Sequence, residues 1–139
     1  MNTNTVEQII EKAKSLRLMG LEYLIGFDIE DVCKAYNGIG PQFLTEKLRN
    51  KVTEILHIFE PAALVHDLRF EQSNGTRTAF DYANCEFFVN CHKCAKAQYR
   101  WWNWKRYRAY AVIDAMNEFN CSDRGGWKAW LDSYESKRK

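Results

Sequence analysis

The sequence predicts a mainly α protein, and three observations support this prediction. Apolar residues recur at intervals of three and four along most of the 139 residues, which is the spacing of one face of a helix. The chain has only two prolines and seven glycines, so long helices can form. No pair of segments shows the alternation of apolar and polar residues that predicts strands. A chain of this length can bury a core of its own, so we expect a single domain over residues 1–139.

The first part of the chain predicts short helical segments. Thr5 has a side chain suited to an N-cap, and apolar residues follow it at helical spacing as far as Leu16. Two glycines bracket LEYLI (21–25), which forms either a second short helix or a turn-rich connection. Residues 28–36 predict another short helix, because an Asn-Gly pair follows and ends it.

Longer helices are predicted over the rest of the chain. Pro41 suits the first turn of a helix that runs to Phe59 with one apolar stripe. Turn signals, Ser-Asn-Gly at 73–75 and Gly-Gly at 125–126, separate the later segments. Helices are expected at 62–70, from about 76 to 94, from 99 to 119 and in the tail from 127.

Charge and cysteine content leave the compartment and the partner open. The formal net charge of +2 predicts no partner by itself. The N-terminal residues lack the basic and apolar regions of a secretory signal, so we expect synthesis in the cytoplasm. The five cysteines are odd in number, and reduced thiols are expected. Signal-independent export or association with a phage particle leaves no mark in such a sequence.

A His-Asp pair, His66 and Asp67, interrupts the apolar stretch AALVHDLRF at 62–70. Ionisable groups are costly to bury unless they are paired, hydrogen-bonded or metal-bound. Successive helical residues point about 100° apart, so these two side chains cannot simply pair with each other. One interpretation is a buried, hydrogen-bonded histidine beside an ordinary helix charge. The other is a pair of side chains with separate functional roles.

Two further segments bear on the second interpretation. YNGIG at 36–40 has glycines at alternate positions, so its backbone can turn carbonyl groups inward, although a plain turn explains the same residues. Carbonyl oxygens and one aspartate are ligands that Ca²⁺ accepts. In FDYANCEFF at 80–88, Asp81 and Asn84 share one helix face. An acceptor there can fix the tautomer of His66, and a neutral imidazole so held can deprotonate a water.

In this order the three segments resemble the secreted phospholipase A2 superfamily. The nearest variety is the compact domain without disulfides in parvovirus capsid proteins and related bacterial or phage proteins. The resemblance covers residues 33–95 and implies a helical domain with two long core helices, here extended by N- and C-terminal helices. It rests on Tyr36, Gly38, Gly40, Ala62, Ala63, His66, Asp67, Ala83, Asn84 and Phe87.

The resemblance implies an activity and a role for each matching residue. The chain is expected to hydrolyse the sn-2 ester of a glycerophospholipid, with Ca²⁺ as cofactor. His66 activates the attacking water, and the backbone N–H of Gly38 helps to hold the oxyanion. The implied Ca²⁺ ligands are the carbonyl groups of Tyr36, Gly38 and Gly40 and the carboxylate of Asp67.

The chain departs from the family pattern at two positions. Asn84 stands where the family has an aspartate that orients the histidine, and Phe70 stands where a tyrosine is usual. Asparagine accepts a hydrogen bond from imidazole but cannot stabilise imidazolium by charge. Asp81, one turn earlier, is therefore a second candidate for orienting His66. The departures favour an alternative function, a catalytically inactive binding or interaction module on membranes or in a phage-type assembly.

The segment CHKC at 91–94, with Cys85 upstream, is either part of a zinc site or a set of free cysteines. A structural zinc site takes four ligands of suitable spacing. The chain has no second C-x-x-C, and the segment continues a helical pattern. Free cysteines, buried or half-buried, are therefore expected.

The segment QYRWWNWKRYRAY at 98–110 combines aromatic and basic residues, and no acidic residue lies between Glu86 and Asp114. Such a mixture suits a membrane–water interface. It also suits stacking and phosphate contact on single-stranded nucleic acid, which makes a small helical nucleic-acid binder a third function class. The preferred explanation of the same residues is that the tryptophans pack in the core and the basic residues form an ordinary solvated face. The candidates for lipid contact are Trp101, Trp102, Trp104 and Arg106.

Overall fold

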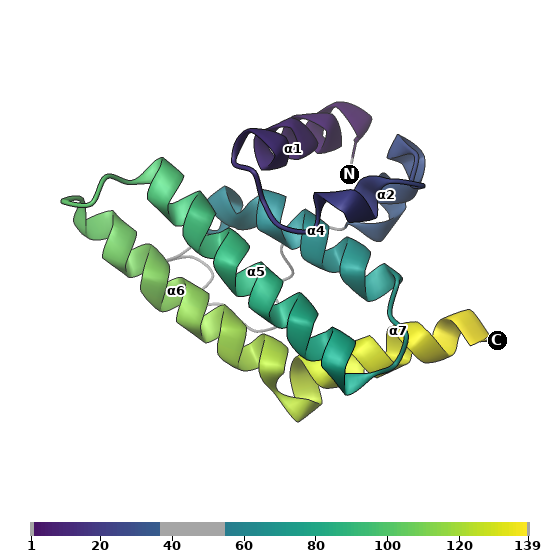
Figure 1. The fold of residues 1–139 in the computed structure, drawn as a ribbon. Helices are drawn as coiled ribbons and strands as arrows, with labels where there is room; N and C mark the ends of the chain where they lie inside the picture. The colour runs from purple at the N-terminus through teal and green to yellow at the C-terminus, as the bar shows by residue number, and fades with distance from the viewer. Residues whose placement is uncertain (1, 37–54, 139) are drawn as a thin grey trace.

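Helices make up most of the computed structural model, which describes residues 2–36 and 55–138 (Figure 1). No strand occurs among these residues, and the predicted mainly α class is confirmed. The phospholipase A2-like arrangement of the helices stays a prediction. In chain order the elements are α1 (Thr3–Ser15), η1 (Leu21–Leu24), α2 (Ile29–Ala35), η3 (His57–Phe59), α4 (Glu60–Glu71), α5 (Arg77–Gln98), α6 (Trp104–Cys121), η4 (Asp123–Trp127) and α7 (Lys128–Arg138).

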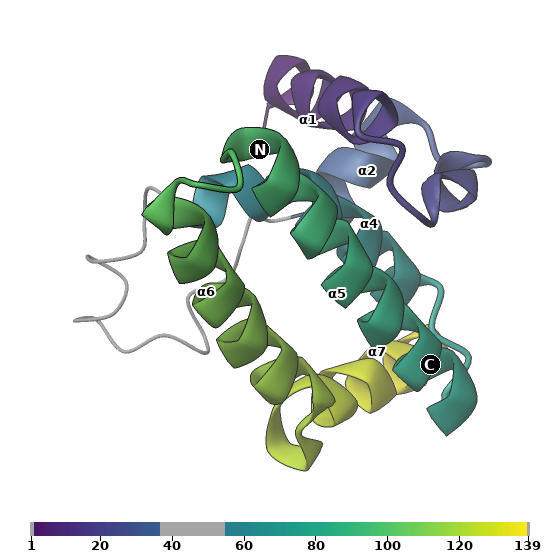
Figure 2. The ribbon, with the colours of Figure 1, turned by 60° about the vertical axis from the view of Figure 1, so that its left-hand side comes forward.

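Helix α5 is the centre of the arrangement. It packs against α4 and α6, and the short connection between α5 and α6 makes these two an antiparallel hairpin (Figures 1 and 2). Helices α1 and α2 cover α4, and α7 packs against α4 near the end of the hairpin where α5 begins. Helix α4 therefore has neighbours on several sides.

The position of α4 explains the apolar stretch that the sequence shows there. Seven of its residues are buried, and they are distributed around the helix rather than along one stripe: Pro61, Ala62, Ala63, Leu64, Val65, His66 and Leu68. A helix that is apolar nearly all round belongs in a core. The sequence of α4 thus specifies a central helix, in which any ionisable group needs a partner.

Side-chain caps begin the helices at positions close to those that the sequence predicts. Asp28 caps α2 by accepting from the Asp31 N–H at 2.8 Å, and Thr76 caps α5. The predicted N-cap Thr5 is wrong. Asn2 accepts from the Thr5 N–H at 2.8 Å instead, so that α1 begins one turn earlier. An asparagine oxygen serves as well in this position as a threonine hydroxyl.

The boundary between α5 and α6 differs from the prediction. The sequence predicts one helix ending near Cys94 and another beginning at Tyr99, whereas α5 continues to Gln98 and α6 begins at Trp104. Asn103 caps α6 by accepting from the Lys105 N–H at 3.0 Å. A run of aromatic and basic residues carries no turn signal of its own, so the cap alone places this boundary.

Two other expectations have separate outcomes. LEYLI forms the 3-10 helix η1, so the short-helix interpretation of that segment is confirmed. The helix expected from Pro41 to Phe59 lies mostly outside the described residues, and its last residues form η3. Within the described ranges, no helix has both the length and the low polarity that crossing a bilayer requires.

Candidate functional site

The side chains of His66 and Asp67 leave α4 in different directions, as the helical geometry predicts. His66 is only 8% exposed and lies against α5, where it meets Asn84. Asp67 is half-buried and acts electrostatically on Tyr36, at the end of α2. The pair therefore contributes to two contacts of α4, one with α5 and one with the end of α2.

Asn84 holds the imidazole of His66 and determines its tautomer. The His66 Nε2 and the Asn84 Oδ1 lie 3.0 Å apart. The amide nitrogen of Asn84 donates to the carbonyl oxygen of Asn120 at 3.1 Å, so the amide oxygen is the atom that faces the ring. A carbonyl oxygen only accepts, and Nε2 must therefore carry the proton. The other ring nitrogen, Nδ1, is left with a lone pair.

Two phenylalanines flank the imidazole. The ring centroids of Phe70 and Phe87 each lie 4.6 Å from that of His66. Burial lowers the pKa of His66 to about 4, the Asn84 hydrogen bond opposes this shift, and the Arg69 charge adds to it. At neutral pH the ring is uncharged, which is the form a general base requires, but it is a weak base.

Asp67 is a half-buried carboxylate without a basic partner among the residues described. Burial alone raises its pKa to about 7. The buried Tyr36 hydroxyl lies near Glu60 and Asp67, and burial together with these two carboxylates raises the pKa of Tyr36 well above its usual value. That hydroxyl makes no hydrogen bond of good geometry within the described part. Three oxygen-bearing side chains therefore lie near one another here, those of Tyr36, Glu60 and Asp67.

The predicted Ca²⁺ ligands fall into two groups. The Asp67 carboxylate acts electrostatically on the Tyr36 hydroxyl, whereas the predicted ligand, the Tyr36 carbonyl oxygen, stays a prediction. Gly38 and Gly40 lie outside the described residues, and so does the predicted oxyanion contact at Gly38. Within residues 2–36 and 55–138, no three His, Cys, Asp or Glu side chains gather as a metal site. The backbone carbonyl ligands that the resemblance implies at Gly38 and Gly40 stay a prediction.

The two candidates for orienting His66 are placed differently. Asn84 makes the contact, but Asp81 does not reach the histidine. The Asp81 carboxylate is exposed and pairs with the guanidinium of Arg77, with 3.4 Å between Asp81 Oδ1 and Arg77 Nε. Asp81 therefore faces solvent and Arg77, whereas Asn84, three residues later on α5, faces α4.

The four candidates for lipid contact are also placed differently. Trp101, Trp102 and Trp104 are 68%, 61% and 63% exposed, so the interpretation that they pack in the core is wrong. Arg106 is half-buried on α6 and its Nε donates to the Tyr110 hydroxyl at 2.8 Å. It therefore lies along the helix, away from the exposed indoles.

Cys91 and Cys94 are free and buried in the main core, as the free-cysteine interpretation expects, whereas Cys85 is free but exposed. Burial raises the pKa of Cys94 to about 11, which keeps its thiol protonated at neutral pH. A protonated thiol is neither a good nucleophile nor a metal ligand. The CHKC segment therefore contributes to packing.

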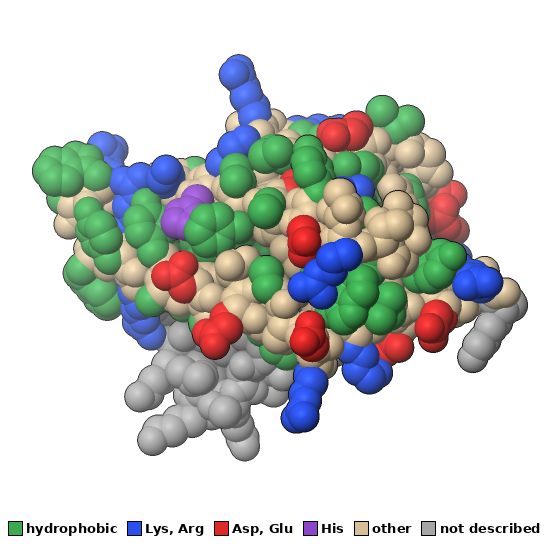
Figure 3. Space-filling model, turned by 60° about the horizontal axis from the view of Figure 1, so that its bottom comes forward, with side chains coloured by type: hydrophobic (Ala, Val, Ile, Leu, Met, Phe, Trp, Pro, Cys, Tyr) green, Lys and Arg blue, Asp and Glu red, His purple; other side chains and the backbone are tan. Residues whose placement is uncertain are grey.

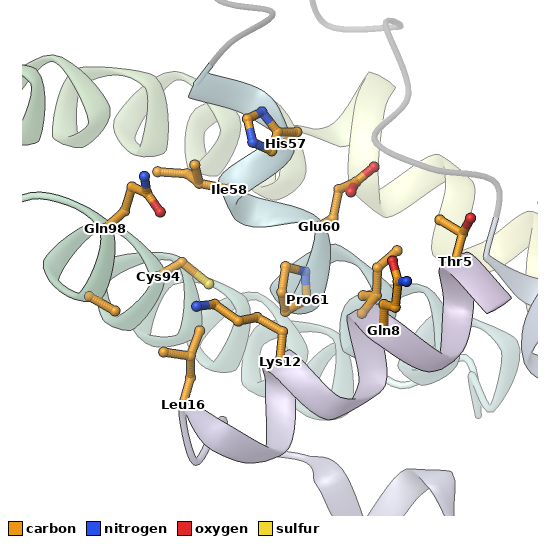
Figure 4. A pocket seen from close by; sticks show the side chains of 12 residues that line it. Thr5, Gln8, Lys12, Leu16, His57, Ile58, Glu60, Pro61, Cys94 and Gln98 are labelled. Carbon is orange, nitrogen blue, oxygen red and sulfur yellow. The ribbon is translucent and has the colours of Figure 1, made fainter.

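The sequence gives no sign of a hollow of about 260 Å³ between α1, the start of α4 and the end of α5 (Figure 4). Lys12 extends across it towards Cys94, and His57 and Glu60 lie along its α4 side. Its lining comes from three distant segments, which no local motif could bring together. His66 is not part of this lining.

Comparisons with protein-family models, curated proteins and solved structures found no match to this chain. The two features that bear on function are the geometry around His66 and the exposed tryptophans. The first of these determines what chemistry the site supports, and the second what surface the protein presents.

Proposed function

We propose that the chain is a Ca²⁺-dependent, phospholipase A2-like hydrolase of the sn-2 ester of glycerophospholipids. The observation that supports this proposal is the contact between His66 and Asn84. It leaves Nδ1 of a neutral imidazole with a free lone pair, and a half-buried aspartate follows His66 in the sequence. The resemblance to phospholipase A2 assigns these two side chains to base and cation ligand.

The proposed chemistry needs one proton acceptor and no covalent intermediate. His66 Nδ1 takes a proton from a water molecule as the water oxygen attacks the ester carbonyl carbon. The proton then passes to the departing alcohol oxygen, and a fatty acid and a lysophospholipid are released. Asp67 would hold the cation, with Tyr36, Gly38 and Gly40 as further proposed ligands. A cation held there would supply positive charge to stabilise the negative charge on the carbonyl oxygen.

Asn84 limits the rate of this proposed reaction. Its amide orients the ring but carries no charge to stabilise the imidazolium that forms. In a Ser-His-Asp triad the corresponding Asp-to-Asn change costs about 10⁴ in rate, and only the direction of that effect applies here. We therefore expect slow hydrolysis, and Asn84→Asp is the substitution expected to accelerate it.

The test is release of fatty acid from mixed phospholipid vesicles in the presence of millimolar Ca²⁺. His66→Gln should lower the rate at least about 100-fold, the lower range for loss of a general base. His92→Gln is the matched control, because His92 lies between the rings of Phe88 and Tyr110. Its loss should leave the rate unchanged. Equal rates for wild type and His66→Gln would overturn the hydrolase.

The burial of His66 favours a second candidate, the catalytically silent module. A ring that is 8% exposed between two phenylalanines is also a satisfied core histidine that aligns α4 with α5. In that case neither wild type nor Asn84→Asp releases fatty acid. Asn84→Asp removes the N–H group that donates to the Asn120 carbonyl oxygen and places a carboxylate against that oxygen. The free energy of unfolding should fall by about 1–3 kcal/mol as a result. Its unfolding is therefore measured alongside its activity.

A further inference from the structure

The connection between α5 and α6 presents large aromatic side chains to solvent. We define the aromatic tip as Trp101, Trp102, Trp104 and Tyr107, which are between 57% and 68% exposed. Figure 3 shows hydrophobic and basic side chains projecting together at that end of the molecule. Indole rings are large apolar surfaces, and leaving three of them in water is unfavourable unless something covers them.

The aromatic tip is held in place by its own hydrogen bonds. The Asn103 N–H donates to the Arg100 carbonyl at 2.9 Å and closes the turn. The Asn103 side chain caps α6, and the Tyr107 hydroxyl donates to the Trp101 carbonyl at 2.8 Å. Because both ends of the turn are fixed, the exposure of the indoles is built into the fold.

The charge around the aromatic tip has one sign. Lys96, Arg100 and Lys105 are exposed in or beside it, and no acidic residue occurs from position 87 to position 113. The formal net charge of the whole chain is only +2, so this end is much more basic than the average surface. A partner that covers the indoles must therefore also accept positive charge.

We propose that the aromatic tip docks on the headgroup region of an anionic lipid bilayer. Tryptophan is favoured at this depth because its ring is apolar and its N–H can still reach polar groups. Lysines and arginines beside it are attracted by the negative surface potential of the leaflet. The aromatic tip thus acts as an anchor that inserts indoles and leaves the basic groups among the headgroups.

The geometry of the rings favours lipid over nucleic acid. The Trp101 and Trp102 rings are 88° apart, so they form no parallel platform for successive bases. The Arg100 guanidinium covers one face of Trp102, with 5.3 Å between its carbon and the ring centroid. Stacking on bases needs open ring faces, whereas insertion between headgroups tolerates any ring orientation.

This inference does not rest on the proposed hydrolase. Asn84 and the end of α5 are 14 residues apart, which corresponds to about 20 Å along the helix. The aromatic tip is therefore an anchor remote from His66, and it serves an active enzyme and a silent module equally. Its test measures binding without turnover, so failure here and failure of hydrolysis are distinguishable.

The experiment is co-sedimentation of the full chain with vesicles in EDTA, which excludes any Ca²⁺-dependent contact. One set of vesicles is phosphatidylcholine alone, and the other contains about one third phosphatidylglycerol. Binding should be stronger to the anionic set and weaken with salt. Tryptophan emission should shift to shorter wavelength on binding, because the exposed indoles of the aromatic tip leave water. Trp127 and Trp130 are already packed against Phe80, so the shift reports the aromatic tip.

Two variants test the aromatic tip and two matched variants serve as controls. One double variant removes two indoles, Trp101→Ala with Trp102→Ala, and the other reverses two charges, Arg100→Glu with Lys105→Glu. Each should lower the affinity for anionic vesicles about tenfold or more. Ile25→Ala removes an apolar residue that is 82% exposed elsewhere, and Arg124→Glu reverses an exposed charge at the opposite end of α6. Both should bind like wild type.

Three results would overturn the proposal. The first is that the protein does not bind the anionic vesicles, and the second is that the variants of the aromatic tip bind as well as wild type. The third is that a single-stranded oligonucleotide binds the aromatic tip more tightly and displaces the protein from the vesicles. The last result would assign the surface to nucleic acid.

Discussion

The Nε2 of His66 and the Oδ1 of Asn84 lie 3.0 Å apart, and the amide nitrogen of Asn84 reaches the carbonyl oxygen of Asn120. One side chain on α5 thus links α4 to the end of α6. Because the Asn120 carbonyl can only accept, its position determines which nitrogen of the histidine carries the proton. The tautomer of the candidate base is therefore specified by a residue two helices away.

The first prediction concerns that proton. Imidazole ¹⁵N spectra should show the Nε2–H tautomer of His66 at neutral pH. The titration midpoint should lie near pH 4, because burial disfavours the charged ring. Asn84→Leu should remove the preference for this tautomer. A midpoint at or above the ordinary value of 6.5, or a proton on Nδ1, would contradict the assignment of His66 as a neutral, oriented base.

A second prediction concerns Asp67 and rests on the proposed cation site. Calorimetric titration with Ca²⁺ at pH 8, from micromolar to about ten millimolar, should show saturable binding that Asp67→Asn abolishes. Affinity should rise with pH through about 7, since protonated Asp67 cannot serve as the ligand. Asp114→Asn, which alters an exposed carboxylate of α6, should bind as wild type does.

Asp67→Asn should abolish Ca²⁺ binding, but it should raise the stability of the Ca²⁺-free protein. The folded-state pKa of Asp67 is raised from 3.8 to about 7, so its contribution to stability is present below pH 3.8 and is lost as pH rises through 7. At pH 8 without Ca²⁺, Asp67→Asn should therefore be more stable than wild type by about 1–3 kcal/mol. Lower stability in this variant would show that Asp67 has a favourable partner.

A third prediction follows from the buried ion pair between Arg69 and Glu86, whose Nε and Oε1 atoms lie 3.6 Å apart. Burial raises the pKa of Glu86 to about 7, although the charge of Arg69 opposes the shift. The free energy of unfolding should fall between about pH 4.5 and pH 7, because over this range Glu86 ionises in the unfolded chain and keeps its proton in the folded chain. Glu86→Gln should remove about 1–3 kcal/mol of this pH dependence. Exposed Glu118→Gln should leave it unchanged in the same urea titrations.

The fourth prediction compares two glycines with the same backbone conformation. Gly20 and Gly26 have φ angles of +89° and +92°. A Cβ on Gly20 meets Glu86 Oε1 at 2.5 Å and Val65 Cγ1 at 2.8 Å, whereas a Cβ on Gly26 meets nothing within 4 Å. Gly26→Ala should lower the free energy of unfolding by about 1 kcal/mol, from the left-handed backbone alone. Gly20→Ala should lower it by about 2–4 kcal/mol, because the Cβ contacts add to the backbone cost. Equal losses in urea titrations would show that the Glu86 side chain moves away freely.

The sequence by itself determined the mainly α class, most of the helices and the separate directions of His66 and Asp67. These features depend on residue spacing, capping side chains and the angle between successive helical residues, which are local properties. It also indicated the order of the segments that resemble phospholipase A2. The resemblance pointed to Asn84 for orienting His66, and helical spacing added Asp81 as an alternative, because two residues three apart share a helix face in any helix.

Only the tertiary structure decided between them. Asn84 contacts His66 because the packing of α4 on α5 brings the middle of α5, rather than its first turn, opposite the histidine. Likewise, tryptophans are equally suited to a core and to a surface, and the turn closed by Asn103 placed three of them in solvent. Which side chains meet across helices depends on packing between distant segments, and local sequence patterns do not encode that directly.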